Sequence, residues 1–370
     1  MGANGVRLET YIEQANPAVR DSIRVLNDIE IDSCNDGGCN GYVVFGNHSV
    51  FRTRVAVKYY YYGENAHEEV SLIKHIANSN VLKVWDAHTI ADGWAYFITD
   101  EHRNGNIDDI IGSTQIDTNT SIRIIRGITN GVGALHSAPN FLLHRDLKPA
   151  NILIDDKFSP IIADFGSIKR MPQNASEVIA SQHSALYRPP ESYDNGKYYY
   201  ASDIYQIGLL FYQLLGGYLP YEPDCYMTKA QKIQYATLES DYDKSRFVDN
   251  CLFDKARKER LLSYSTLPAY TDKRLIQIIK KATRADYRSR YANIANIQLA
   301  LHSVGNLPNW YRKAEVLFCE NRGSRYRIVA VQRNKYQIER EYSNQKWSKL
   351  RGSSVCDTEN DAIGYLLNSL

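Results

Sequence analysis

The chain has 370 residues, of which 44% are hydrophobic and 23% charged, a composition typical of a folded globular protein and not of a disordered one. The formal net charge of +2 is too small to indicate that the chain as a whole binds nucleic acid or a membrane surface. Six cysteines are too few for a disulfide scaffold, and no run of about eighteen apolar residues predicts a membrane span. We therefore expect a cytoplasmic protein with reduced thiols and no contact with a membrane.

Residues 25–103 predict a small β-rich region that follows a helical lead-in. The lead-in over 1–24 is interrupted at Asn16-Pro17, and a glycine-rich loop at 36–41 lies between two β-prone segments. Apolar residues at helical spacing predict a helix over 68–76. The strands that we expect in this region lie near 29–31, 42–45 and 55–58, with two more between 81 and 99 around the turn Ala91-Asp92-Gly93.

Helical patterns dominate from the break at Asn104-Gly105-Asn106 to about residue 305. One apolar stripe runs along 122–135 and another along 204–214, where Gly216-Gly217 forms a C-terminal cap signal. A small sheet region followed by a larger helical region predicts an α+β fold.

The character of the sequence changes again beyond Pro308. Segments 315–319, 326–331 and 335–341 predict three strands, and 359–367 predicts a helix with Asp357 or Thr358 as its N-cap. We expect a separate, small, β-rich module over 308–370. Basic and aromatic residues alternate in it, a pattern that leaves three uses open: binding of nucleic acid, docking of a regulator or protein substrate, and a solvated basic surface.

One stretch of the chain points to chemistry. The sequence HRDLKPAN at 144–151 is followed by DFG at 164–166. Phosphoryl transfer needs one carboxylate near the attacking hydroxyl and separate oxygen ligands that hold Mg²⁺ on the triphosphate. The segments 152–154 and 160–163 predict two short strands joined by a turn, which would return Asn151 and Asp164 to the same edge. Two ligands of one metal ion require such an arrangement.

These motifs, together with VAVK at 55–58 and RPPE at 188–191, stand in the order found in one family. Residues 25–305 resemble the eukaryotic-type (Hanks-type) serine/threonine protein kinases. The resemblance implies the bilobal protein-kinase fold, with a small β-rich N-lobe over 25–103 and a larger helical C-lobe over 104–305. It also implies that the protein uses ATP and Mg²⁺ to phosphorylate Ser or Thr hydroxyls of protein substrates.

The resemblance assigns roles to the polar residues of these motifs. Asp146 would orient the substrate hydroxyl and accept its proton, and Lys148, which is typical of the serine/threonine form, would stabilise charge on the transferring phosphate. Asn151 and Asp164 would bind Mg²⁺. Lys58 would contact the phosphates of ATP and would be kept in place by an acidic partner. The residue that aligns with this partner is Glu69, and the alternative is Glu68, which lies one residue off the required helix face.

The resemblance also implies an ATP-binding slot. The glycine-rich loop matches the family pattern at Gly38, Gly41 and Val43, but Asp36 stands where the first glycine is expected. The adenine would be held by the side chains of Val43, Ala56 and Leu153 and by the backbone of Asp100 and His102, with Thr99 at the gatekeeper position.

Further positions of the family are structural or regulatory. Glu191 and Arg290 would form a buried ion pair, and Asp203 would tie a central helix to the catalytic loop. Arg145 suggests control by phosphorylation of the segment between 164 and 191, because an arginine there can pair with a phosphate. The candidate acceptors in that segment are Ser167, Ser176 and Ser181, and Ser184 would contact the catalytic Asp and Lys.

Two other functions compete with an active protein kinase. A pseudokinase that acts as a scaffold is supported by Asp36 and by the short gap between Lys58 and Glu69. A small-molecule kinase of the same broad fold would use the same carboxylates and asparagine, but Lys148, the RPPE segment and Arg290 favour the branch that phosphorylates proteins.

Overall fold

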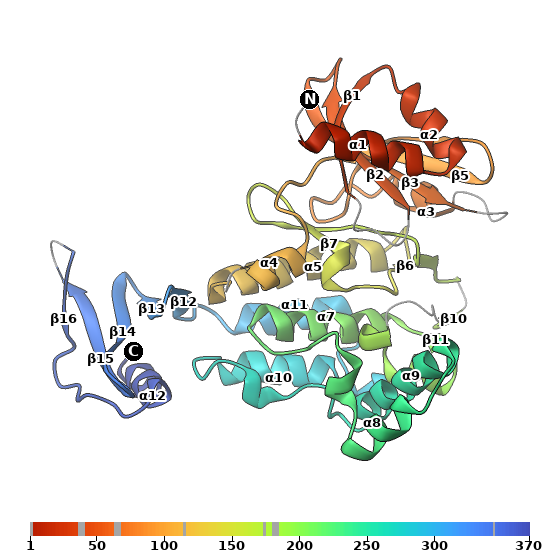
Figure 1. Ribbon diagram of the computed structural model, residues 1–370. Helices are drawn as coiled ribbons and strands as arrows, with labels where there is room; N and C mark the ends of the chain where they lie inside the picture. Colours follow the sequence, from red (N-terminus) through yellow and green to blue (C-terminus); the bar gives the residue numbers. More distant parts are fainter. Residues whose placement is uncertain are drawn as a thin grey trace. The chain divides into compact units, whose positions relative to one another are not determined.

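The computed structural model describes residues 3–35, 41–62, 68–113, 116–172, 175–179, 185–342 and 345–370, and at 3–6, 68–70 and 112–113 only the backbone is described. Two compact units make up the chain (Figure 1): Met1–Arg103 with Ile161–Gly166, and Asn104–Pro160 with Ser167–Leu370. No helix in the described part of the chain is long and apolar enough to cross a membrane.

An antiparallel sheet dominates the first unit. The hairpin between its last two strands turns at Asp92 and Gly93, whose φ angles of 57° and 75° are the left-handed pair that a type I′ turn requires. The expected five-stranded sheet with one helix is confirmed for the described residues. The strands are β1 (Ile29–Asn35), β2 (Tyr42–His48), β3 (Thr53–Tyr61), β4 (Val84–Thr89) and β5 (Trp94–Asp100), in the order β1-β2-β3-β5-β4, and the helix is α3 (Glu68–Ile73).

The two faces of this sheet have different neighbours. Helices α1 (Ala3–Gln14) and α2 (Pro17–Arg24) lie against one face (Figure 1), where Val19 shares a buried hydrophobic cluster with Val57 of β3. Side chains alternate along a strand, so Lys58 projects from the opposite face. The sheet therefore has one face built into a core and another face that carries the predicted phosphate-binding lysine.

Helices make up most of the second unit. They are α4 (Ile107–Ser113), α5 (Thr118–His136), α6 (Pro190–Asp194), α7 (Tyr200–Leu214), α8 (Lys229–Ala236), α9 (Asp241–Arg257), α10 (Lys273–Ala282) and α11 (Ile294–Ser303). Short strands and 3₁₀ turns connect them. The strands are β6 (Leu142–Leu143), β7 (Ile152–Ile154), β8 (Pro160–Ile162), β9 (Lys169–Arg170), β10 (Val178–Ile179) and β11 (Lys197–Tyr198), and the 3₁₀ turns are Pro149–Asn151, Ala185–Tyr187, Pro223–Tyr226, Tyr264–Thr266 and Tyr287–Ser289.

Helix α7 is enclosed on all sides. Every residue from 201 to 214 is buried, whereas the sequence pattern indicated a stripe along one side only. The crossing with α10 is close because Gly208 has no side chain: a Cβ there would lie 2.6 Å from Cγ2 of Thr283. Gly216, with φ of 89°, ends the helix, and its N–H donates to the backbone O of Gln213, so the expected C-terminal cap is confirmed.

The C-terminal module is a sheet covered by one helix. Three strands were expected, but the described sheet has two more, one at each edge. The edge strands were missed because each buries at most one side chain and so has no apolar pattern. Thr358 caps the helix by accepting from the N–H of Asp361 at 3.1 Å, as predicted. The elements are β12 (Asn309–Lys313), β13 (Val316–Asn321), β14 (Ser324–Gln332), β15 (Lys335–Tyr342), β16 (Lys346–Lys349) and α12 (Glu359–Ser369), with the strands in chain order.

The module is attached to the helices through aromatic stacking. Trp310 of β12 is buried, and its ring stacks on Tyr270 with the ring centres 5.0 Å apart and the planes within 6°. The N–H of Asn119, in the first turn of α5, donates to Oδ1 of Asn309 at 3.0 Å. The core of the module thus continues into the helical unit.

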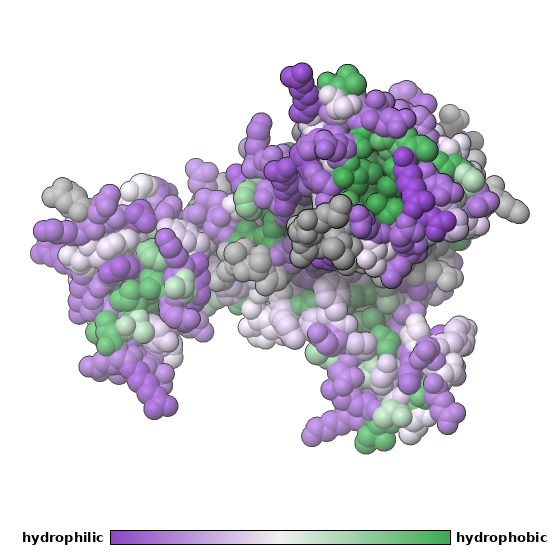
Figure 2. All heavy atoms as spheres, turned by 45° about the horizontal axis from the view of Figure 1, so that its top comes forward, coloured by the Kyte–Doolittle hydropathy of each residue, from purple (hydrophilic) through white to green (hydrophobic). Residues whose placement is uncertain are grey.

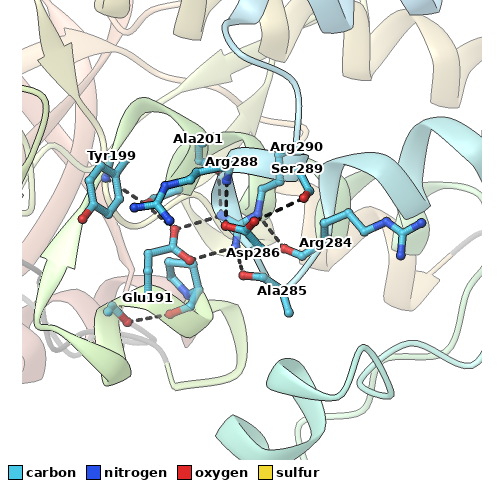
Figure 3. Close-up of polar contacts among 12 residues, drawn as sticks. Glu191, Tyr199, Ala201, Arg284, Ala285, Asp286, Arg288, Ser289 and Arg290 are labelled. Carbon is cyan, nitrogen blue, oxygen red and sulfur yellow. Dashed lines mark hydrogen bonds and ion pairs between the residues drawn. The ribbon is translucent and has the colours of Figure 1, made fainter.

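A buried ion pair links α6 to the segment before α11 (Figure 3). Both terminal nitrogens of the Arg290 guanidinium donate to the carboxylate of Glu191, each at 2.8 Å, and both side chains are buried. Ser202 donates to Oε1 of the same carboxylate at 2.6 Å. The predicted buried pair is therefore confirmed. The remaining N–H groups of Arg290 donate to the backbone O atoms of Ala201, Arg284 and Ala285.

We predict that Arg290→Leu lowers the free energy of unfolding by about 3–5 kcal/mol, because the substitution leaves Glu191 charged and buried without its partner. The control is Lys258→Gln, which removes an exposed ion pair with Asp254 and should change the free energy of unfolding by less than about 1 kcal/mol. Urea denaturation of both variants measures the difference. Equal losses in the two variants would contradict a structural role for the buried pair.

Candidate functional site

One buried carboxylate holds the loop at 144–151. Asp203, near the start of α7, is fully buried and accepts from the backbone N–H groups of His144 and Arg145, each at 2.9 Å. Nε2 of His136, the last residue of α5, lies 2.8 Å from Oδ2 of Asp203. The predicted tie between the central helix and the loop is confirmed. His136 was not predicted, since it follows an apolar stripe that gives no signal for its partner.

The charge state of Asp203 follows from its neighbours. Burial alone would raise the pKa of this carboxyl. The hydrogen bond and charge of His136, with the charge and backbone N–H of His144, outweigh burial and hold the pKa of Asp203 below its ordinary value. The loop is therefore held by an ionised acceptor, which forms stronger hydrogen bonds than a neutral one.

Gln206, one turn further along α7, holds the next part of the loop. Its Oε1 accepts from the N–H of Leu147 at 2.9 Å, and its Nε2 donates to the backbone O of Tyr187 at 3.2 Å. The hydroxyl of Tyr198 donates to the backbone O of Arg145 at 3.2 Å. Sequence reasoning missed Gln206. The available signal was an amide side chain within an apolar run, because a buried amide needs partners.

Asp146 has one oxygen that is held and one that is free. Nζ of Lys148 and Nδ2 of Asn151 lie 2.9 Å and 3.0 Å from Oδ2 of Asp146, and Asn151 also donates to its backbone O at 2.8 Å. Oδ1 of Asp146 is buried and has no hydrogen-bond partner among the described residues. A buried acceptor without a donor is costly, so this atom fits a hydroxyl group supplied by a bound molecule.

In the first unit the structure brings together Lys58 and Asp164. Nζ of Lys58 lies 2.9 Å from Oδ1 of Asp164. Asp164 has a φ of 56°, an uncommon backbone conformation for a residue with a side chain. Glu69 lies in α3, but its side chain is outside the described residues, so its ion pair with Lys58 stays a prediction.

The glycine-rich loop is described only at its end. Asp36 and Gly38 lie outside the described residues. Gly41 has a φ of 136°, and a Cβ on it would lie 2.0 Å from the backbone O of Tyr59 in β3. No other residue fits at this position, because both the backbone conformation and the close approach exclude a side chain.

Residues expected to contact the adenine divide between the two units. In β2 and β3, Val43 pairs with Lys58 in register and Ala56 lies two residues before Lys58, so the three side chains share one sheet face. Asp100 ends β5 opposite Val55, and His102 follows it. In the second unit, Leu153 lies half-buried in β7. Thr99 is buried and donates to the backbone O of Lys83.

Arg145 binds backbone oxygens of the segment that follows Asp164. Its Nε donates to the O of Ser167 at 2.5 Å and one terminal nitrogen donates to the O of Ile179 at 2.6 Å. Strand β10 also pairs with β11, where Lys197 forms an ion pair with Glu177. Arg145 and β11 therefore hold the described part of this segment in place.

Of the serines predicted as phosphate acceptors, Ser167 is buried and Ser176 is exposed. Ser181, the third predicted acceptor, lies outside the described residues, and so does Ser184, which was predicted to contact the catalytic Asp and Lys. Exposure favours Ser176 among the described positions, since a modifying enzyme must reach the hydroxyl.

The basic residues of the module are partly neutralised. Arg327 forms an ion pair with Glu339, and Arg325 forms ion pairs with Glu341 and Glu320. The side of the module seen in Figure 2 is mostly hydrophilic, with apolar atoms gathered in a small area. These pairs favour a solvated surface over binding of nucleic acid, which needs unpaired positive charge.

Folding lowers the pKa of Asp203, so its contribution to stability is present above the unfolded-state pKa of about 4 and is lost as the pH falls through the lower folded-state value. We predict that Asp203→Asn lowers the free energy of unfolding by about 1–3 kcal/mol near neutral pH, because one buried N–H loses its acceptor. The difference from wild type should shrink below about pH 4. Urea denaturation across pH measures this, with the exposed Asp254→Asn as control. A difference that does not change with pH would contradict the assignment.

Comparison with known proteins agrees with this geometry. A family model described as the protein kinase domain matches residues 38–302. In Arabidopsis thaliana, the leucine-rich repeat receptor-like serine/threonine/tyrosine-protein kinase SOBIR1 is 32% identical over 41% of this chain and 25% of its own length. The probable serine/threonine-protein kinase PBL28 is 30% identical over 40% and 42%, and the inactive leucine-rich repeat receptor-like protein kinase CORYNE is 29% identical over 43% and 39%. The chain spans less than half the length of each relative. Since the family model matches more than half of the chain, this chain belongs to the protein kinase family.

Proposed function

We propose that the chain is an active serine/threonine protein kinase that transfers the γ-phosphate of ATP to hydroxyl groups of protein substrates. The observation that carries this proposal is the buried, unpartnered Oδ1 of Asp146, next to an Oδ2 that Lys148 and Asn151 hold. A carboxylate used only for structure would have both oxygens satisfied. This one keeps a free acceptor beside a cation.

Asp146 would act by positioning and by accepting a proton. Its Oδ1 accepts the hydrogen bond of a substrate Ser or Thr hydroxyl and takes the proton as the hydroxyl oxygen bonds to the γ-phosphorus. The bond from that phosphorus to the bridging oxygen breaks, and ADP leaves. Lys148 stabilises the negative charge on the transferring group. Because Lys148 and Asn151 hold Oδ2, the free oxygen keeps one orientation.

The chain also offers the oxygen donors that Mg²⁺ prefers. The carbonyl of Asn151 and the carboxylate of Asp164 would hold the ion, and Asn151 uses its amide nitrogen for both hydrogen bonds described here, which leaves its carbonyl oxygen for a metal. When bound, Mg²⁺ neutralises charge on the phosphates of ATP.

Lys58 would contact the α- and β-phosphates, with Glu69 as its partner when Asp164 binds the metal. Gly38 and Gly41 would let the backbone approach the phosphates. The adenine contacts would come from Val43, Ala56 and Leu153 and from the backbone of Asp100 and His102.

An inactive scaffold remains the second candidate, because one relative is named an inactive kinase. The two functions differ in the fate of ATP: a scaffold that binds nucleotide would transfer no phosphate.

A small-molecule kinase is less well supported than a protein kinase. Glu191 pairs with Arg290, and β10, near Ser176, pairs with β11. These contacts order a surface on which a protein substrate could bind, and a small molecule needs no such surface.

We predict that Asp146→Asn lowers kcat for phosphorylation by at least about 100-fold while the KM for ATP changes little, because proton acceptance is lost and nucleotide contacts are kept. Asp156→Asn, which alters an exposed carboxylate in the nearby turn, is the matched control and should keep wild-type activity. The measurement is the initial rate of autophosphorylation with Mg²⁺ at varied ATP concentration, with the phosphorylated residues identified by mass spectrometry. Phosphate on Ser or Thr supports the proposal. Wild-type protein that binds ATP but transfers no phosphate would support the scaffold instead.

A further inference from the structure

The hydroxyl of Tyr11, in α1, lies between the ends of two strands. It donates to the backbone O of Asn35 at 3.0 Å and accepts from the backbone N–H of Val43 at 3.0 Å. Asn35 and Val43 face each other in register and are the last pair of β1 and β2. The Tyr11 hydroxyl, which comes from outside the sheet, thus bridges the backbone groups of the last β1–β2 pair.

This end of the hairpin carries the residues predicted to contact ATP. Gly41 lies against the backbone of Tyr59 in β3, because a Cβ on Gly41 would be only 2.0 Å from the backbone O of Tyr59. Val43 pairs with Lys58 across β2 and β3. The backbone of 41–43 is therefore fixed by β3 on one side and by the Tyr11 hydroxyl at its end. A shift of Val43 would move this backbone relative to Lys58.

The helix that carries Tyr11 is itself attached to the sheet by polar contacts. The hydroxyl of Tyr42 accepts from the backbone N–H of Asn16, between α1 and α2, at 3.2 Å. The rings of Tyr11 and Tyr42 meet edge to face, with their centres 5.9 Å apart. On α2, Ser22 shares a buried hydrogen bond with the hydroxyl of Tyr59 at 3.3 Å. The position of Tyr11 is thus set by the docking of both helices.

We propose that Tyr11 is a positioning residue for nucleotide binding: its hydroxyl fixes the end of the β1–β2 hairpin, and through Gly41 and Val43 it sets the affinity for ATP. The inference rests on the proposed kinase function. It gives the N-terminal helices a role in substrate affinity and not only in stability. Tyr11 does not touch the reacting atoms, so it should affect binding of ATP more than transfer of phosphate.

The test is Tyr11→Phe in the full chain, which removes the hydroxyl and keeps the ring against Tyr42. We expect the KM for ATP to rise about threefold to tenfold, the ratio that corresponds to the loss of about one net hydrogen bond, with kcat within about twofold of wild type. Hydrogen exchange of the Val43 amide should become faster, because its acceptor is gone. This second readout does not depend on activity.

Tyr365→Phe is the matched control, because it removes a tyrosine hydroxyl that donates to the backbone O of Gly352 at 2.9 Å in the C-terminal module and leaves the Asn35–Val43 pair untouched. It should lower stability as Tyr11→Phe does but leave the KM for ATP near the wild-type value. An unchanged KM in Tyr11→Phe, or an equal rise in both variants, would overturn the proposal while leaving the kinase function in place. A wild-type chain that binds no ATP analogue with Mg²⁺ in calorimetry would overturn both.

Discussion

The buried carboxylate of Asp203 is the constraint on which the candidate catalytic loop depends. It accepts from two successive backbone N–H groups, those of His144 and Arg145, and Arg145 has a φ of 68°. A left-handed conformation costs a residue with a side chain of the order of 1 kcal/mol, and two hydrogen bonds to a charged acceptor offset that cost. The bend at Arg145 then places Asp146 with one oxygen held and the other available. A change at Asp203 would therefore affect the candidate catalytic carboxylate of Asp146 without touching it.

The first turn of α7 forms hydrogen bonds with two segments that are far apart in the sequence. Ser202 donates to Glu191, which pairs with Arg290, while the next residue, Asp203, holds the loop that contains Asp146. Both contacts start from a helix that is buried on every side, so neither can shift without disturbing the core. The segment around Glu191 and the candidate catalytic loop are consequently held by the same buried helix, and their relative positions are fixed by packing as well as by hydrogen bonds.

Sequence reasoning succeeded where residue type and spacing determine the role. The pair of Glu191 with Arg290, the tie between Asp203 and the loop at 144–151, and the five described strands of the first unit follow from motifs and patterns that leave few alternatives. It failed where the role depends on a neighbour distant in the sequence. The roles of Gln206 and His136 arise from the residues that fold against them, and a local pattern does not identify those partners. The edge strands of the module were missed for a related reason: a strand that buries one side chain or none has no apolar period to detect.

The N-terminal helices α1 and α2 also have a packing partner that their own sequence does not reveal. Their sequence predicts helix but does not say what they cover, and in the structure they cover the sheet face opposite Lys58. Val57 belongs to the core beneath these helices, and the adjacent Lys58 belongs to the candidate nucleotide face. Because adjacent residues of a strand point to opposite faces, one peptide unit separates Val57, which packs against the helices, from Lys58, the predicted phosphate ligand. A sheet is a single layer of backbone, so a change that shifts α1 and α2 would also shift the strands whose other side chains form the opposite face.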